Sequence, residues 1–241
     1  MPTPIKVPVR IEQVFNHNDT IKSFVMKPLK FMPDFHPGQF LHFAIDDYSA
    51  SGHWPESRVF SIASSPTRKD SIRITFIVKG AFTERMFREV KEGDTAWVKF
   101  PYGNFTINQT SNLALIAGGT GITPFISFLE YAIDTEIESN ITLYYGIKSK
   151  ENFIYSEVLE ECKKKLKNFT LILYIEDVDD KPVAIPFTQG RINLDKIYEA
   201  HKDDENCLYY ISGPQVMVTN FMTGLIDRKI PQSRVIIDEW E

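Results

Sequence analysis

A run of five apolar residues followed by three glycines and a proline constrains this chain more than any other stretch. The run covers residues 113–117, and such a run is typical of a parallel strand that is buried on both faces. Gly118, Gly119 and Gly121 follow it, then Pro124, after which apolar residues recur at helical spacing. A strand, a glycine turn and a helix that begins near a proline form half of a nucleotide-binding βαβ unit, whose helix start favours a pyrophosphate.

This stretch differs from two better-known phosphate motifs. Pro124 stands where the third glycine of the dinucleotide fingerprint would be, and no Gly-Lys-Ser/Thr follows as it would in a P-loop. An ordinary strand-to-helix turn in an α/β domain explains the stretch equally well. The rest of the chain therefore has to decide between the two interpretations.

Length and composition favour two domains in a soluble, cytoplasmic chain. The 241 residues exceed the usual size of one domain. The net charge of −5, from 27 basic and 32 acidic residues, argues against binding to nucleic acid or to an anionic membrane surface. The sequence has no apolar signal core at its start and no apolar run long enough to span a membrane.

The cysteines and histidines do not indicate a metal centre. Cys162 and Cys207 are the two cysteines of the chain, and two thiols cannot supply the four ligands of an iron–sulfur cluster or of a closed zinc site. A disulfide is not expected in a cytosolic protein, so both are interpreted as small core or half-buried residues in preference to a catalytic thiol. The five histidines show no ligand spacing.

The first half of the chain has the pattern of short β-strands between turn signals. We expect strands at residues 5–14, 20–26, 39–45, 58–62, 72–78 and 95–100. Six short strands at this spacing predict an antiparallel barrel or sandwich. One helix is expected over residues 83–90, with Thr83 as its N-cap.

Two segments of this half carry groups that suit a planar, phosphorylated ligand. Arg58, Phe60 and Ser61 offer a guanidinium for phosphate, a ring for stacking and a hydroxyl for a ring nitrogen. Strand alternation would place Arg58 and Phe60 on one face, and Val59 and Ser61 on the other. Residues 80–83 form a glycine turn that leads into a helix start, which suits an anion. The alternatives are an edge strand with a surface arginine and plain helix capping.

Three segments therefore occur in a specific order along the chain. They are Arg58-Val59-Phe60-Ser61, Gly80-Ala81-Phe82-Thr83 and the stretch at 118–124. Together they resemble the ferredoxin–NADP reductase superfamily, whose motifs are Arg-x-Tyr-Ser, Gly-x-x-Ser/Thr and Gly-Gly-Thr-Gly-Ile-x-Pro, with Phe60 here replacing the usual tyrosine. Smaller matches extend the resemblance over nearly the whole chain, at residues 37–40, 101–105 and 212–217.

The resemblance implies a two-domain β + α/β fold. A flavin-binding antiparallel β-barrel would occupy residues 1–107, and a parallel-sheet, nicotinamide-binding α/β domain would occupy residues 108–241. The pattern of the second half agrees, because strands and helices alternate there. The strands are expected at 113–117, 141–145, 169–175, 208–211 and 234–237, and the helices at 124–133, 156–166, 194–201 and 214–227. Residues 178–190 are interpreted as a loop over the adenosine site.

The resemblance also assigns a flavin site on the barrel. Arg58 and Thr83 would hold the flavin phosphates, Phe60 its ring system, and Ser61 the polar edge near the hydride-accepting nitrogen. The other residues expected around the flavin are Val59, Phe76, Val78, Lys79, Gly80 and Phe82. FAD is favoured over FMN because the glycine turn offers a place for a pyrophosphate.

A nicotinamide site is implied at the ends of the parallel strands. Thr120, Thr123 and Ser212 would position the nicotinamide, with Ser212 replacing the cysteine that is common in the family. The other expected contacts are Gly119, Gly121, Pro124, Gly146, Lys148, Glu176, Asp177, Gly213, Pro214 and Met217. The carboxylates of Glu176 and Asp177 repel a 2′-phosphate and favour NADH over NADPH, whereas Lys148 and Lys150 favour the opposite choice.

The chain end would complete the site. Trp240 matches the aromatic residue that often covers the flavin ring in this family, and Asp238 matches an acidic residue two positions earlier. With Ser61 and Ser212 they form the expected catalytic set. A terminal tryptophan can also simply pack against the barrel.

These assignments imply a reductase that moves hydride from NADH, with NADPH possible, to bound FAD. Electrons would then pass to a separate acceptor, such as a ferredoxin, a flavodoxin, an oxygenase, ferric iron or a small molecule, because no iron–sulfur cluster is expected in this chain. Two alternatives are kept. One is a free-flavin or ferric reductase without a tightly bound flavin, and the other is a non-catalytic electron-relay or nucleotide-sensing subunit.

Overall fold

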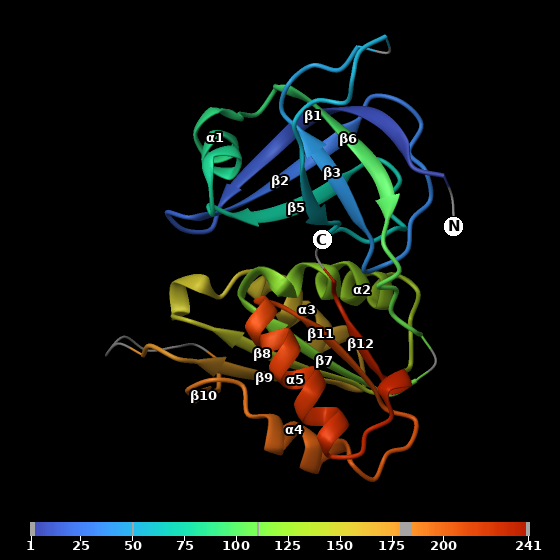
Figure 1. The fold of residues 1–241 in the computed structure, drawn as a ribbon, viewed down its shortest axis with the longest axis vertical. Helices are drawn as coiled ribbons and strands as arrows, with labels where there is room; N and C mark the ends of the chain where they lie inside the picture. Colours follow the sequence, from blue (N-terminus) through green and yellow to red (C-terminus); the bar gives the residue numbers. More distant parts are fainter. Residues whose placement is uncertain (1–2, 50, 110, 179–184, 240–241) are drawn as a thin grey trace.

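The computed structural model describes residues 3–49, 51–109, 111–178 and 185–239. The fold contains two sheets, which lie one after the other along the long axis of the molecule (Figure 1). The first sheet is antiparallel and nearly closed, with the strand order β4-β3-β6-β1-β2-β5. Its strands are β1 (Ile5–Asn16), β2 (Ile21–Pro28), β3 (Phe40–Ala44), β4 (Arg58–Ser61), β5 (Ile72–Ile77) and β6 (Thr95–Tyr102). All six predicted strands are present, and the barrel is confirmed.

Alternation along β5 shows how the barrel core is built. Ile72, Ile74 and Phe76 point inward and are buried, as the period of two predicts. Thr75 lies between these residues on the other face of the strand, yet it is only 5% exposed. This face of β5 is covered by the second half of the chain, which a pattern read within one strand cannot show.

The barrel carries one helix, α1 (Ala81–Glu89). The prediction that Thr83 is its N-cap is wrong, because the N-cap is Gly80 and Thr83 is the third helical residue. From there the Thr83 hydroxyl reaches back and accepts hydrogen bonds from the N–H groups of Lys79 at 2.8 Å and Gly80 at 3.1 Å. The threonine still caps the helix start, but from inside the first turn.

The second sheet is parallel throughout, in the order β10-β9-β8-β7-β11-β12. Its strands are β7 (Leu113–Gly118), β8 (Ile141–Ile147), β9 (Phe169–Ile175), β10 (Phe187–Gln189), β11 (Leu208–Ser212) and β12 (Val235–Ile237). The helices are α2 (Thr123–Asp134), α3 (Ser156–Lys165), α4 (Leu194–His201) and α5 (Gln215–Asp227). One apolar cluster joins α2 and α3 to one face of the sheet, and another joins α4 and α5 to the opposite face. The predicted two-domain β + α/β fold is thus confirmed.

Three details differ from the predicted elements. β10 lies within the segment that was interpreted as a loop, and pairs with β9. The helix after the glycines is preceded by a 3-10 turn, η1 (Gly119–Ile122). Arg234, the expected first residue of the last strand, instead ends a further 3-10 turn, η3 (Gln232–Arg234).

The two sheets meet at α2, which lies between the barrel and the parallel sheet (Figure 1). The connection runs from β6 to β7, and the domain boundary at 107/108 within it stays a prediction. Phe105 and Ile107 already pack in the apolar cluster of α2 and β7. None of the helices in the described part of the chain has the length and apolar character needed to cross a bilayer.

Both cysteines are free and buried, which confirms their interpretation as core residues. Burial raises the pKa of the Cys162 thiol and that of the Cys207 thiol to about 12. Each thiol therefore stays protonated at neutral pH.

Candidate functional site

The glycine turn after β7 packs directly against the turn after β11. A Cβ added to Gly121 would lie 2.5 Å from the carbonyl oxygen of Ser212 and 2.6 Å from the backbone nitrogen of Gly213. Gly119 differs, because its φ of +54° is left-handed and a Cβ there would meet nothing within 4 Å. The lack of a side chain at Gly121 thus allows the two turns to pack closely. At Gly119 it leaves open space in front of the turn after β7.

The start of α2 extends this turn. Pro124 lies in the first helical turn, as predicted, and Thr120 is partly exposed. The Thr123 hydroxyl donates to the carbonyl oxygen of Thr120 at 3.0 Å, so it already has a structural partner. β5 of the barrel contacts η1. The expected nicotinamide turn therefore lies where the two domains meet.

Ser212 and Asp238 form a buried pair at the ends of β11 and β12. The Ser212 hydroxyl donates to Oδ2 of Asp238 at 2.8 Å, and the two residues are 0% and 4% exposed. Burial raises the pKa of Asp238 to about 7, although the hydrogen bond from Ser212 opposes the rise. The structure thus joins two of the predicted catalytic residues. Trp240 lies outside the described residues.

Arg58 and Phe82 bring the first two motifs together at the open side of the barrel. The Arg58 guanidinium lies 4.9 Å from the centroid of the Phe82 ring, which belongs to the first turn of α1. It also donates to Glu56 at 2.7 Å, while about half of its side chain remains exposed. A cation and a helix start thus share one surface, which is an arrangement that binds phosphate.

Ser61 and Phe60 differ in what they offer a ligand. Among the described residues, the Ser61 hydroxyl oxygen has no hydrogen-bond partner although it is buried. The Phe60 ring packs in the barrel core, with its centroid 6.4 Å from that of Phe43 and 6.0 Å from that of Phe76. Stacking of a flavin on Phe60 stays a prediction.

The remaining predicted flavin residues fall into two groups. Phe76 is buried in the core, and the Thr83 hydroxyl is used within the helix start. The residues with exposed or partly exposed surface are Val59, Val78, Lys79 and Gly80.

A cavity of about 440 Å³ lies at the ends of β8, β9 and β10 and includes the predicted cofactor contacts Glu176 and Asp177. Its lining residues are Ser149, Lys150, Glu151, Ile175, Glu176, Asp177, Val178 and Gln189. Glu176 and Asp177 are exposed here, and Arg191 donates to Glu176 at 2.8 Å. Two residues here were not predicted as site residues: Gln189, which lines the cavity from the short β10, and Arg191, which contacts the cavity residue Glu176 from the turn after β10.

Other predicted contacts at the strand ends have packing partners. Lys148 is exposed beside the cavity, and its carbonyl oxygen accepts from the N–H of Asp177 at 2.7 Å. A Cβ on Gly146 would lie 2.7 Å from the Ile192 side chain. Met217 lies over both glycine turns, since its sulfur would be 2.8 Å from a Cβ on Gly118. Gly213 and Pro214 complete the second turn, and Pro214 is exposed.

Comparison with known proteins identifies the family. The model of the oxidoreductase NAD-binding domain matches residues 115–222. The gamma subunit of sulfhydrogenase 2 from Pyrococcus furiosus is 31% identical over 211 residues, which cover 83% of this chain and 70% of that subunit. The chain belongs to the ferredoxin–NADP reductase superfamily. The predicted resemblance is therefore confirmed.

Other members of the superfamily match along almost the whole chain. The reductase component of propane 2-monooxygenase from Mycolicibacterium smegmatis is 27% identical over 251 residues, covering 97% of this chain and 67% of that protein. A ferredoxin NADP⁺ reductase from Neisseria gonorrhoeae, solved with bound FAD and NADP, superposes with a TM-score of 0.78 at 17% identity, covering 97% of this chain and 98% of that one. This structural likeness shows the fold.

Proposed function

We propose that this chain is a cytoplasmic flavoprotein reductase, which moves hydride from NADH to bound FAD and passes electrons to a separate acceptor. The observation that carries the proposal is the buried Ser61 hydroxyl, which has no partner among the described residues and ends the strand of the flavin motif. A buried hydroxyl without a partner is costly, and a ligand atom would satisfy it. Membership of the superfamily supports the same assignment.

The groups on the barrel fit a flavin with a pyrophosphate. When bound, FAD accepts hydride and releases electrons singly or in pairs. Arg58 would bind phosphate, and would exchange its contact with Glu56 for it. The first N–H groups of α1 have no helical acceptor and would bind the same anion. Ser61 would donate its hydroxyl to the polar edge of the ring.

The groups on the parallel sheet fit a nicotinamide dinucleotide. Gly119 leaves space for its backbone approach, and the cavity at Glu176 would receive the adenosine. Ser212 and Asp238 would lie near the nicotinamide, and the pKa of about 7 lets Asp238 hold or release a proton at neutral pH. The acceptor would be a separate protein, such as an oxygenase or a ferredoxin, and one relative is named as the reductase component of a propane 2-monooxygenase.

An anaerobic titration tests the function. The protein is reconstituted with FAD and titrated first with NADH and then, in a second sample, with NADPH, while the flavin absorbance is recorded. Stoichiometric bleaching by NADH is the expected result. A bound flavin that neither nucleotide bleaches would show an electron-relay or sensing subunit, and a preparation that retains no flavin would show a free-flavin reductase.

Arg58→Ala is expected to weaken flavin retention roughly tenfold or more, because a charge-assisted hydrogen bond to phosphate contributes about 1.5–3 kcal/mol. NADH binding should change less. The measurement is the dissociation constant of FAD from fluorescence titration, with Arg10→Ala as the control, since Arg10 is an exposed arginine of β1. Equal flavin affinity in the Arg58 variant and the control would remove Arg58 from the flavin site.

Glu176→Arg combined with Asp177→Ser is expected to shift the kcat/KM ratio toward NADPH by roughly tenfold, because a carboxylate near a 2′-phosphate is replaced by a cation. The matched control is Glu199→Arg with Asp203→Ser, which makes the same charge change on exposed residues elsewhere. An unchanged ratio in the first variant would show that the ribose binds away from Glu176.

A further inference from the structure

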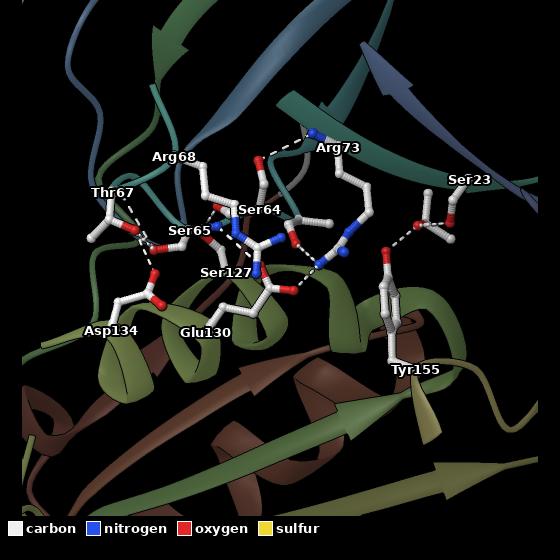
Figure 2. Close-up of polar contacts among 12 residues, drawn as sticks. Ser23, Ser64, Ser65, Thr67, Arg68, Arg73, Ser127, Glu130, Asp134 and Tyr155 are labelled. Atoms are coloured by element: carbon white, nitrogen blue, oxygen red, sulfur yellow. Dashed lines mark hydrogen bonds and ion pairs between the residues drawn. The ribbon is translucent and has the colours of Figure 1, made fainter. Parts of the chain in front are cut away.

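A row of polar side chains on α2 attaches this helix to the segment that follows β4 (Figure 2). Ser127 donates to the carbonyl oxygen of Ser64 at 2.7 Å, and Glu130 accepts from the N–H of Ser65 at 3.2 Å. Further along, the Thr67 hydroxyl donates to Asp134. Residues 127, 130 and 134 share one helix face, because they are three and four positions apart. We call this set of contacts the α2 seam.

Arg73 of β5 holds the centre of the seam. Its guanidinium donates to Glu130 at 2.5 Å and to the carbonyl oxygen of Ala63 at 2.6 Å. The side chains of Arg73 and Glu130 are 14% and 5% exposed, so the pair is largely removed from water. Arg68 adds a longer contact to Glu130, at 3.5 Å. Glu130 thus binds three separate points of the barrel.

A second polar contact crosses between the domains beside this pair (Figure 2). The Arg73 guanidinium lies 4.9 Å from the centroid of the Tyr155 ring, and the Tyr155 hydroxyl is hydrogen-bonded to Thr75. The Thr75 hydroxyl is in turn hydrogen-bonded to the Ser23 hydroxyl. Arg73 is therefore enclosed between a carboxylate of α2 and a ring at the start of α3.

The position of the seam connects it to the proposed reaction. α2 begins directly after η1, the turn expected to carry the nicotinamide, and Ser64 follows the proposed flavin contact Ser61 by three residues. We propose that Arg73 and Glu130 are positioning residues, which set the orientation of the α/β domain against the barrel so that hydride donor and acceptor meet at reacting distance. This inference rests on the proposed function.

The chemistry of the pair favours orientation over stability. A buried ion pair adds little net stability compared with apolar residues of the same size. Its hydrogen bonds are directional, however. The Ala63 carbonyl holds the Arg73 guanidinium in place on the barrel, and the bond from that guanidinium to Glu130 then restricts how α2 lies against the barrel. An error of about 1 Å in the position of reacting groups can cost roughly a hundredfold in rate.

Two measurements on the FAD-loaded protein test the proposal. The first is the distance distribution between spin labels at Lys91→Cys on the barrel and Lys196→Cys on α4, from pulsed electron paramagnetic resonance. Both positions are exposed, whereas the native thiols are buried. We expect a narrow distribution of label-to-label distances in the protein that carries only the two label sites. After Glu130→Ala or Arg73→Met, the distance distribution should become broader or shift. After Glu130→Gln, its width should be intermediate.

The second measurement is the limiting rate of flavin reduction at saturating NADH in a stopped-flow experiment. We expect Glu130→Ala to lower this rate roughly ten- to a hundredfold, while the dissociation constant of NADH stays within about twofold. The control is Asp195→Asn, which removes an ion pair with Arg228 inside the α/β domain. It should leave both the rate and the distance distribution unchanged.

The outcomes separate the two proposals. Wild-type distance distributions and limiting rates in both Glu130→Ala and Arg73→Met would overturn the positioning role. If these variants do not fold, the same two measurements are made on Glu130→Gln and Arg73→Lys, which keep the approximate size of each side chain. Wild-type results in both would then overturn the positioning role. If NADH does not reduce the flavin bound to the wild-type protein, the proposed function is contradicted. In that case, the distances between the spin labels alone would decide whether the α2 seam sets the orientation of the two domains.

Discussion

Gly121→Ala is expected to destabilise the protein by roughly 1–3 kcal/mol and to weaken NADH binding strongly. The new methyl group would lie 2.5 Å from the carbonyl oxygen of Ser212 and 2.6 Å from backbone atoms of Gly213. Backbone atoms cannot turn aside as a flexible side chain can, so the turns after β7 and β11 must separate. The measurement is urea unfolding together with NADH titration.

Gly93→Ala is the matched control for this prediction. Gly93 lies in the barrel before β6, outside the proposed nucleotide site, and a Cβ added there would meet nothing within 4 Å. Its left-handed φ of +93° should cost about 1–3 kcal/mol without displacing another segment, and NADH binding should not change. If both variants weakened NADH binding equally, the close contact at Gly121 would not be what shapes the site.

Asp238→Asn is expected to change the pH dependence of stability. The pKa of Asp238 is raised from 3.8 to about 7 by burial, so the folded state binds this proton more tightly than the unfolded state does. The wild-type protein should therefore lose stability as the pH rises from about 4 to 7, by roughly 4 kcal/mol in total. Asparagine cannot ionise and can still accept the hydrogen bond from Ser212, so the variant should escape this loss.

Urea unfolding at pH 4, 6 and 8 checks the prediction. The variant and the wild type should be similar at pH 4, and the variant should be more stable at pH 8. Other groups titrate over the same range, so the quantity to compare is the difference between the two proteins. Asp195→Asn, at an exposed position, controls for the loss of a carboxylate. A difference that does not vary with pH would show that Asp238 has an ordinary pKa.

The elements that sequence patterns predicted are those with strong local signals. The apolar run at residues 113–117 gave β7 to within one residue, and the alternation in β5 identified the inward residues of that strand. β10 escaped prediction because it has only three residues, with no apolar run, and exists through its backbone pairing with β9. The N-cap at Thr83 failed because a hydroxyl at the third helical position can bond back to the preceding turn.

The site was predictable as a set of motifs but not as a set of contacts. Ser212 and Asp238 were both expected, yet their hydrogen bond depends on the pairing of β11 with β12, which brings residues 26 positions apart together. Arg73 gave no functional signal, because its place in an alternating strand is typical of a solvent-facing residue. Its burial comes from a helix of the other domain, and no local pattern contains that information.

The two buried thiols have a consequence for oxidative damage. Peroxide oxidises the thiolate form of cysteine, and accessibility limits the reaction further. With the pKa of each thiol raised to about 12, Cys162 and Cys207 hold almost no thiolate at neutral pH, and neither side chain meets the solvent. Reactive oxygen species that form when a reduced flavin reacts with dioxygen would therefore not oxidise either cysteine of the native fold to a sulfenic acid.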